Sequence, residues 1–438
     1  MPFTSNLISS SGMFFENIAV GYCIPHPPTT VDPSSGVGQR RFEDSWLEMV
    51  FPLADNVNLR ESMVRVDGRN IRYGMLFEIL DALAADVAYR HTGGLHDKSN
   101  PTTIVTASVD GLHAFKYINA FEDLKLQGYI SYTGSSSMEV CIDILSVSPE
   151  GVDKVVGKIL FREIHFTRFL SLGNTQFIMV ARSKEGKATK VHGLSLEGEQ
   201  ESEIKQRFEA GRMRVQQRKE RSTHSLSISA PSPEEVEVMH KLFIESNGLK
   251  AQKDKILSGR IDSVDGFGRS RFKWMKNTVY KTVLLMHPQE RNVHGNIFGG
   301  YLMKVAMELS WVTAMCFVGT NYPVFLSADK IEFMNPVSIG AIMEFTGRVV
   351  YAANDKFVVQ VLAHNVNRET NEKTATNKLT YVYQASASPE SGSVHDLDVC
   401  VDAVRVFDIV PQEYEECIAY IEGRRAMADY NESRSANL

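Results

Sequence analysis

The sequence is organised around the stretch His287-Pro-Gln-Glu-Arg-Asn-Val-His-Gly-Asn-Ile-Phe-Gly-Gly-Tyr-Leu-Met-Lys304. This stretch is a polar loop with three glycines, Gly295, Gly299 and Gly300, and it runs directly into an apolar segment. A loop of this kind places backbone N–H groups at the positive end of a helix dipole, where an anion or a developing oxyanion can be held. The stretch therefore predicts the start of a helix and, beside it, a candidate site.

The segment after the loop predicts a long buried helix. Residues 300–317 include only two charged side chains, and a helix that is apolar almost all round belongs inside a core. The uncharged stretch 309–328 is about as long as a membrane span. However, the sequence Gly319-Thr-Asn-Tyr-Pro323 divides it into the end of a helix, a turn and the start of a strand. We therefore predict a core helix and no membrane span.

Composition is that of an ordinary soluble protein. The chain has 438 residues, enough for two or three domains, and a formal net charge of −6. Because there is no basic excess, nucleic acid is not an expected partner. The five cysteines are scattered and never form a C-x-x-C pair, so the sequence predicts neither a disulfide framework nor a zinc site.

Several common catalytic motifs are missing from the sequence. It has no G-x-S-x-G nucleophile elbow and no G-x-x-x-x-G-K-[ST] phosphate loop. The histidines outside the glycine loop form no H-x-x-x-H or H-E-x-x-H spacing, so we predict no metal site. Gly266-Phe-Gly268 lacks the third glycine of a dinucleotide-binding motif. Serine hydrolases, nucleotide hydrolases and dinucleotide enzymes are therefore disfavoured.

An internal repeat is the strongest organisational feature of the chain. When Gly74 is aligned with Gly300, each half has an apolar helix, a turn and then a strand, Val105–Asp110 in the first half and Val324–Asp329 in the second. A glycine that marks the next strand follows each aspartate after the same interval of 18 residues; these glycines are Gly128 and Gly347. We therefore predict an α+β fold in which one long helix and several antiparallel strands occur twice.

Changes in composition divide the chain into segments. The middle of the chain is dense in Glu, Lys, Arg and Gln and contains a Ser- and Pro-rich break, which is typical of a solvated linker. We predict an irregular lead-in over 1–45, a first domain over 46–195, a charged helical linker over 196–265, a second domain over 266–390, and a tail with a helix over 391–438.

The two halves carry complementary polar residues. Seven residues after the aligned glycine, the first half has Asp81 and the second has Met307, whereas the second half has Asn292 where the first has Val66. Taken singly, the acid is also consistent with a satisfied buried carboxyl and the amide with ordinary turn chemistry. If the halves pack about a pseudo-twofold axis, one site between them contains both polar groups and its mate is a relic.

These residues resemble a known family. His287–Asn292 followed by Ile297–Met303 resembles the second hotdog domain of the double-hotdog acyl-CoA thioesterases, and most closely their mitochondrial thioesterase-nine branch. Leu80–Ala84 together with Thr106–Asp110 resembles the acid-bearing hotdog domain of the same enzymes. The resemblance implies two hotdog domains in tandem, each with a long helix wrapped by an antiparallel sheet, arranged as a pseudo-twofold double hotdog with the two sheets joined edge to edge.

The resemblance also implies catalytic roles for individual residues. Asp81 would be the general base that activates water, or alternatively a direct nucleophile. Asn292 would position the water or the thioester carbonyl. The backbone N–H of Gly299, with Gly300 beside it, would be the oxyanion donor. Ser108 would help to hold the water.

Four further residues are candidates for substrate binding. His294 and Asn296 lie in the glycine loop, and Arg182 and Lys187 lie at the end of a predicted strand. The two basic side chains are candidates for binding the phosphates of CoA, although solvated loop charges are the alternative interpretation.

The predicted activity is hydrolysis of acyl-CoA to a free carboxylic acid and CoA, with one site per chain. A non-catalytic acyl-CoA sensor or scaffold and a hotdog hydratase or dehydratase are the alternatives. No cofactor is expected, since a thioester is already an activated acyl group and coenzyme A is part of the substrate. Kinship suggests a homo-oligomer, a trimer of double hotdogs. It also suggests a mitochondrial location, with the cytoplasm as the alternative, since the first 15 residues contain no Arg or Lys.

Overall fold

The computed structural model describes residues 22–25, 38–93, 103–114, 118–147, 169–183, 186–197, 201–223, 225–226, 228–257, 272–292, 294–319, 322–386 and 406–436. The chain forms two compact units. The first contains residues 1–212 and two segments of the second half of the sequence, 286–305 and 332–340; the second contains the remaining residues. The glycine loop and the start of its helix therefore belong to the unit that contains Asp81.

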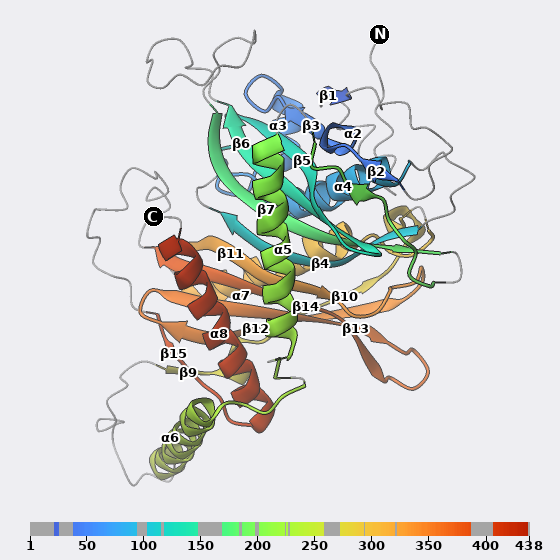
Figure 1. Cartoon of the computed structure of the whole chain (residues 1–438). Coiled ribbons are helices and arrows are strands. Elements are labelled where there is room, and N and C mark those ends of the chain that lie inside the picture. Colours follow the sequence, from blue (N-terminus) through green and yellow to red (C-terminus); the bar gives the residue numbers. More distant parts are fainter. Residues whose placement is uncertain are drawn as a thin grey trace. The chain divides into compact units, whose positions relative to one another are not determined.

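In the first unit a long helix packs against an antiparallel sheet (Figure 1). Helix α4 (Tyr73–Thr92) is rich in Ala and Leu, and nearly all of its residues are buried. It ends at Gly93, whose left-handed φ of 107° is accessible mainly to glycine. The strand order is β1-β3-β5-β6-β7-β4, and the strands are β1 (Tyr22–Pro25), β3 (Leu47–Phe51), β5 (Asp123–Thr133), β6 (Ser137–Val147), β7 (Phe169–Arg182) and β4 (Thr103–Ala114).

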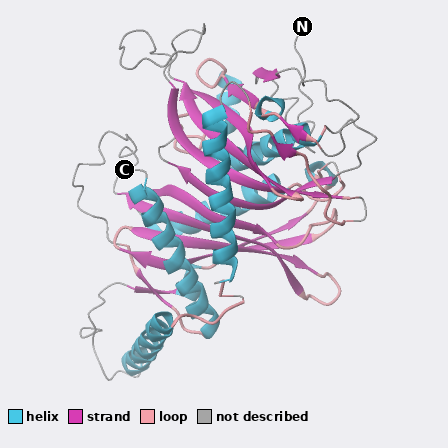
Figure 2. Ribbon diagram, viewed as in Figure 1, coloured by secondary structure: helices cyan, strands magenta, loops and turns pink. Residues whose placement is uncertain are grey.

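Shorter elements complete the first unit (Figure 2). Two short strands pair in parallel, and two short helices precede α4. These elements are β2 (Gln39–Arg40), α2 (Phe42–Ser45), α3 (Val57–Met63), β8 (Gly193–Leu194) and the beginning of α5 (Glu201–Thr223). Strands β1 and β2 lie within the stretch 1–45 that was predicted to be irregular; most of that stretch lies outside the described residues.

The second unit repeats the combination of a long helix and a sheet. Helix α7 (Gly299–Val318) begins in the first unit and continues in the second. The strand order is β11-β14-β13-β12-β10, and the strands are β10 (Tyr280–Leu285), β11 (Tyr322–Phe333), β12 (Ile342–Ala353), β13 (Lys356–Val366) and β14 (Lys373–Ser386). The predicted α+β architecture, with a helix and an antiparallel sheet in tandem, is confirmed.

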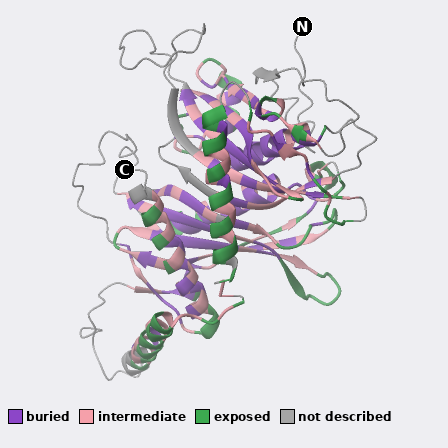
Figure 3. Cartoon of the chain, viewed as in Figure 1, coloured by how far each residue is buried: buried purple, intermediate pink, exposed green. Residues whose placement is uncertain are grey.

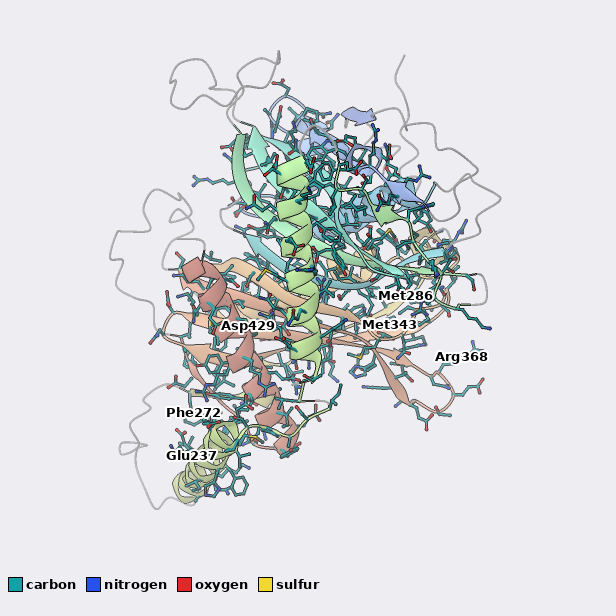
Figure 4. The ribbon with its side chains drawn as sticks, in the orientation of Figure 1. Glu237, Phe272, Met286, Met343, Arg368 and Asp429 are labelled. Carbon is teal, nitrogen blue, oxygen red and sulfur yellow. The ribbon has the colours of Figure 1, made fainter. Side chains whose placement is uncertain are left out.

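Further helices and a parallel strand pair complete the second unit. The helices of the predicted linker and tail are present, and residues 258–265 of the linker and 391–405 of the tail lie outside the described residues. Glu235 on α6 forms a bidentate ion pair with Arg425 on α8, with both N–O distances 2.7 Å. Figure 4 labels Phe272 at β9, where an apolar cluster joins α6 to the strand pair. The elements are α6 (Pro233–Leu257), β9 (Phe272–Trp274), η1 (Met275–Thr278), β15 (Asp408–Val410) and α8 (Tyr414–Ala436).

The two glycines that mark the repeat make the same contact in both halves. A Cβ atom on Gly128 would lie 2.9 Å from Val87 and 3.4 Å from Leu83 of α4. A Cβ atom on Gly347 would lie 2.6 Å from Thr313 and 3.3 Å from Leu309 of α7. The alignment of Gly74 with Gly300 pairs these helix residues with one another, so each glycine lets a strand approach its own central helix closely.

The repeat also includes a long helix at the end of each half. Gly211 of α5 approaches Tyr132 of β5, and Gly423 of α8 approaches Tyr351 of β12; a Cβ atom would lie 2.7 Å and 2.8 Å from the respective tyrosine Cβ. Much of α5 remains exposed on its other side (Figure 3). Each of these helices therefore packs on the sheet of its own half, while the predicted domain boundaries stay a prediction.

Helix α7 is, among the described residues, the one helix long and apolar enough to cross a membrane. Half of its most apolar window is buried inside the protein, and Met303, Ala306 and Ala314 are almost fully buried. These contacts are those of a core helix, and we retain that prediction.

We expect the substitution Gly128→Ala to destabilise the protein by about 1–3 kcal/mol, because the new methyl group would overlap the packed side chain of Val87. Gly193→Ala is the matched control, since its Cβ would meet Gln39 at an ordinary 3.6 Å. Thermal unfolding measures both, and equal midpoints for the two variants would contradict the packing described here.

Candidate active site

Asp81 lies in the middle of α4 and is only 1% exposed. The hydroxyl of Thr106 on β4 donates a hydrogen bond of 2.7 Å to its Oδ1 atom. The backbone N–H of Gly300, in the first turn of α7, donates a second hydrogen bond to the carboxylate. A buried carboxylate is therefore held by a strand hydroxyl and by the N-terminus of another helix.

Two glycines make the contact between α7 and Asp81 sterically possible. A Cβ atom on Gly299 would lie 3.0 Å from Oδ2 of Asp81, and one on Gly300 would lie 3.0 Å from Cα of Glu78 and 3.1 Å from Cβ of Asp81. The first turn of α7 thus approaches α4 more closely than most side chains would permit. Within the described part of the chain, the Gly299 N–H has no acceptor and remains available to a ligand.

Burial raises the pKa of Asp81 from 3.8 to about 6. The hydrogen bonds from Thr106 and Gly300 oppose this shift because they stabilise the carboxylate, and the charge of Glu78 adds to it. A carboxyl group of this pKa is ionised at neutral pH and is a stronger base than an exposed aspartate.

Thr106, not the predicted Ser108, provides the hydroxyl that contacts Asp81. A bulge separates the two residues on β4, since Thr106 is opposite Met179 and Ser108 is opposite Ile178. Consecutive residues of β7 point to opposite faces of the sheet, so their partners on β4 also do so. Within the described residues, no hydrogen bond joins Ser108 to Asp81. The role predicted for Ser108 stays a prediction, and the bulge argues for Thr106 in its place.

The loop before α7 is organised by Asn292. Its Oδ1 atom accepts hydrogen bonds from the backbone N–H groups of His294 (2.9 Å) and Asn296 (3.1 Å), and its own N–H donates to the Asn296 carbonyl at 2.6 Å. Gly295 takes a φ of 80° at the tip of this turn. Because the carbonyl oxygen is occupied, the amide NH₂ group is the part of Asn292 left without a protein partner among the described residues.

His294 contacts Tyr89, a residue that sequence reasoning missed. The tyrosine hydroxyl lies 2.7 Å from Nε2 of His294 and accepts a hydrogen bond of 3.2 Å from the N–H of Ile104. Burial lowers the pKa of His294, which favours neutral imidazole. Tyr89 follows Asp81 by eight residues, about two helical turns, so both lie on one face of α4. The spacing of eight residues from Asp81 was the signal in the sequence that could have identified Tyr89 as a residue of the site.

The predicted basic residues lie near this end of the site. Arg182 ends β7 opposite Thr103, the residue before Ile104, and Lys187 lies in the turn that follows. Both side chains are exposed. Lys184 lies outside the described residues.

The chain is similar to proteins of known family. A profile of the thioesterase superfamily matches residues 294–371. Acyl-coenzyme A thioesterase 9, mitochondrial, from Homo sapiens is 30% identical over 392 residues, covering 89% of this chain and 78% of that protein. The chain belongs to the acyl-coenzyme A thioesterase family. Acyl-coenzyme A thioesterase 10, mitochondrial, from Mus musculus is 28% identical, covering 88% of this chain and 78% of that protein. Acyl-coenzyme A thioesterase 2, chloroplastic, from Humulus lupulus is 27% identical, covering 98% of this chain and 89% of that protein.

In this member of the thioesterase family, the second unit has Met307 at the position equivalent to Asp81. Met307 is 2% exposed, and its sulfur contacts the hydroxyls of Ser310 (3.7 Å) and Tyr383 (3.8 Å). Phe325 and Tyr383 of the second unit occupy the positions that correspond to Thr106 and Met179 of the first, and the two aromatic rings lie 5.9 Å apart. Val66, the counterpart of Asn292, belongs to the first unit and is 89% exposed.

Among the described residues, no group of three or more His, Cys, Asp or Glu side chains is placed to hold a metal ion.

We expect Asp81→Asn to make the folded state of this thioesterase-family protein more stable than wild type at neutral pH. The folded pKa of about 6 exceeds the unfolded value of 3.8, so the wild type loses stability as pH rises from 4 through 6, by about 3 kcal/mol in total. The variant lacks this loss. Thermal unfolding at several pH values measures the difference, which should grow across this window and level off above pH 7; a difference that is constant with pH would contradict the shifted pKa.

Proposed function

We propose that this chain hydrolyses acyl-CoA to a free carboxylic acid and CoA at a site built around Asp81. The observation that supports this most strongly is the buried carboxylate beside the N–H of Gly299, which has no acceptor among the residues that the structure describes. A base and an oxyanion donor at one place are what acyl transfer to water requires. The names of the human and mouse relatives support the substrate class.

In the proposed mechanism the Asp81 carboxylate removes a proton from water, and the hydroxide oxygen forms a bond to the thioester carbonyl carbon. The Gly299 N–H and the NH₂ group of Asn292 donate hydrogen bonds to the oxygen that becomes negative. The carbon–sulfur bond then breaks, and the CoA sulfur takes the proton from Asp81. Direct attack by Asp81 on the carbonyl carbon is the less favoured route, since the carboxylate is already held by Thr106 and Gly300. Neither route needs a metal or a redox cofactor.

The CoA part of the substrate is assigned to the end of the site that contains His294. Neutral His294, held by Tyr89, and the backbone around Asn296 would contact the pantetheine, and the exposed side chains of Arg182 and Lys187 would meet the phosphates. A homo-oligomer, a trimer of double hotdogs, remains our prediction. A mitochondrial location is proposed from the names of the human and mouse relatives.

The first test is release of free CoA thiol from short-, medium- and long-chain acyl-CoAs. Asp81→Asn should lower kcat by about 10²–10⁴-fold, because the general base is lost. Asn292→Ala should lower kcat by about 10²–10³-fold, because an oxyanion donor is lost.

Met307→Ala is the matched control, since Met307 occupies the Asp81 position of the other half; it should lower the unfolding temperature and leave turnover largely intact. Normal rates in Asp81→Asn would overturn the proposed mechanism. Binding of acyl-CoA without thiol release by the wild type would instead indicate a sensor.

A second test separates Thr106 from Ser108. Thr106→Val keeps the shape of the side chain but removes the hydrogen bond to the ionised carboxylate, which raises the pKa of Asp81. The acid limb of the pH profile of kcat/KM should therefore move up by about one pH unit. Ser108→Ala should leave the limb in place. The opposite result, a shift in Ser108→Ala alone, would restore the role first predicted for Ser108.

A further inference from the structure

A partly buried ion pair joins the two central helices beside the site. The ammonium group of Lys304 on α7 lies 3.0 Å from Oε2 of Glu78 on α4. The Glu78 side chain is 4% exposed and that of Lys304 is 23% exposed. Breaking a pair of this kind leaves a buried charge without compensation, so both partners matter to the position of the helices.

The two residues of the pair occupy equivalent positions in the two repeats. Aligning Gly74 with Gly300 also aligns Glu78 with Lys304, since each lies four residues after its glycine. In a symmetric dimer of a single repeat, this position would meet its own copy and two like charges would repel. An ion pair here is possible only because the two halves have diverged, as they have at Asp81 and Met307.

The pair is one helical turn from the groups that hold the acid. Glu78 precedes Asp81 by three residues on α4, and Lys304 follows Gly300 by four residues on α7. A Cβ atom on Gly300 would lie 3.0 Å from Cα of Glu78 and 3.1 Å from Cβ of Asp81. The first turn of α7 therefore crosses α4 at the turn 78–81, and the ion pair fastens this crossing.

Other titratable groups face the same place. The loop before α7 contributes Glu290 and His287, and α7 contributes Tyr301. Burial and then the charge of Glu78 raise the pKa of Glu290, while Lys304 and His287 lower it. Burial, Glu290 and Glu78 raise the pKa of Tyr301. Among the described residues, Glu78 is the charged group that acts on Asp81, and the Lys304 ammonium pairs with Glu78.

We propose that Glu78 and Lys304 are positioning residues, which hold the first turn of α7 against α4 and balance the charge beside Asp81. The inference rests on the proposed function of Asp81 as the base. Neither residue is assigned a contact with the substrate. Removing the lysine exposes Asp81 to the full charge of Glu78, whereas removing the charge of Glu78 exposes Asp81 to the lysine.

The test is the acid limb of the kcat/KM profile for acyl-CoA hydrolysis in two single variants. Lys304→Met should move the limb to higher pH and Glu78→Gln should move it to lower pH, each by roughly one unit. Lys304→Met should also lower kcat at neutral pH by about tenfold or more, with a smaller change in KM, because the oxyanion donor is displaced from the base. The double variant should return the limb toward the wild-type position.

The matched control is Lys125→Met, which breaks an equally sheltered pair with Glu48 at 2.6 Å on the sheet and should leave the limb unmoved. Shifts in the same direction, or no shift in either single variant, would overturn the proposal. If Lys304→Met does not fold, Glu78→Gln and Lys304→Arg decide: the limb must fall in the first and stay near wild type in the second. Turnover by the wild type and its loss in Asp81→Asn report on the proposed function separately.

Discussion

The site depends on one close contact, the hydrogen bond between the Gly300 N–H and the buried carboxylate of Asp81. Removing a carboxylate from water is costly, and the protein offsets the cost with one hydroxyl and one helix N-terminus. The N-terminus can approach only because positions 299 and 300 lack side chains. The glycine loop, the turn around Asn292 and the entry of α7 all follow from this requirement.

The same contact supports the role of general base that we propose for Asp81. If Asp81 were fully solvated, its pKa would be ordinary and its basicity weak; if it had no donors, burial would keep it protonated at neutral pH. Thr106 and Gly300 bring the pKa to about 6, so the carboxylate is both formed and basic. We propose different roles for two neighbouring amides. The Gly300 N–H holds the base, and the Gly299 N–H donates a hydrogen bond to the oxyanion.

The repeat gives the chain one scaffold twice and, in our proposal, the chemistry once. Gly128 and Gly347 make the same strand-to-helix contact, yet Met307, Phe325 and Tyr383 fill the place that corresponds to the acid site. This asymmetry was readable from the sequence, since the repeat is regular and Asp81 is out of keeping with its apolar neighbours. The long helices, the antiparallel strands and the glycine loop were predicted for the same reason: hydrophobic periodicity and glycine spacing are local signals.

Other features depended on contacts that no local pattern reveals. A single extra residue in β4 turns Ser108 away and leaves Thr106 facing Asp81, and bulges leave no clear mark in a sequence. Tyr89 and Lys304 lie on helices whose apolar pattern predicts burial but not which polar partner each side chain meets, since His294 and Glu78 are distant in sequence. Helix α5 was expected as part of a solvated linker because charged residues dominate its composition, whereas Gly211 lies against Tyr132 of the sheet.

Direct titration of the Asp81 carboxyl is the measurement that tests most directly whether this buried group has a raised pKa. Infrared difference spectra of wild type against Asp81→Asn, recorded from pH 4 to 8, isolate the carboxyl band of this residue. We predict a protonated carboxyl that ionises with a midpoint of about 6. A midpoint near the ordinary value of 3.8 would show that the carboxyl is solvated or fully compensated, and would contradict this prediction.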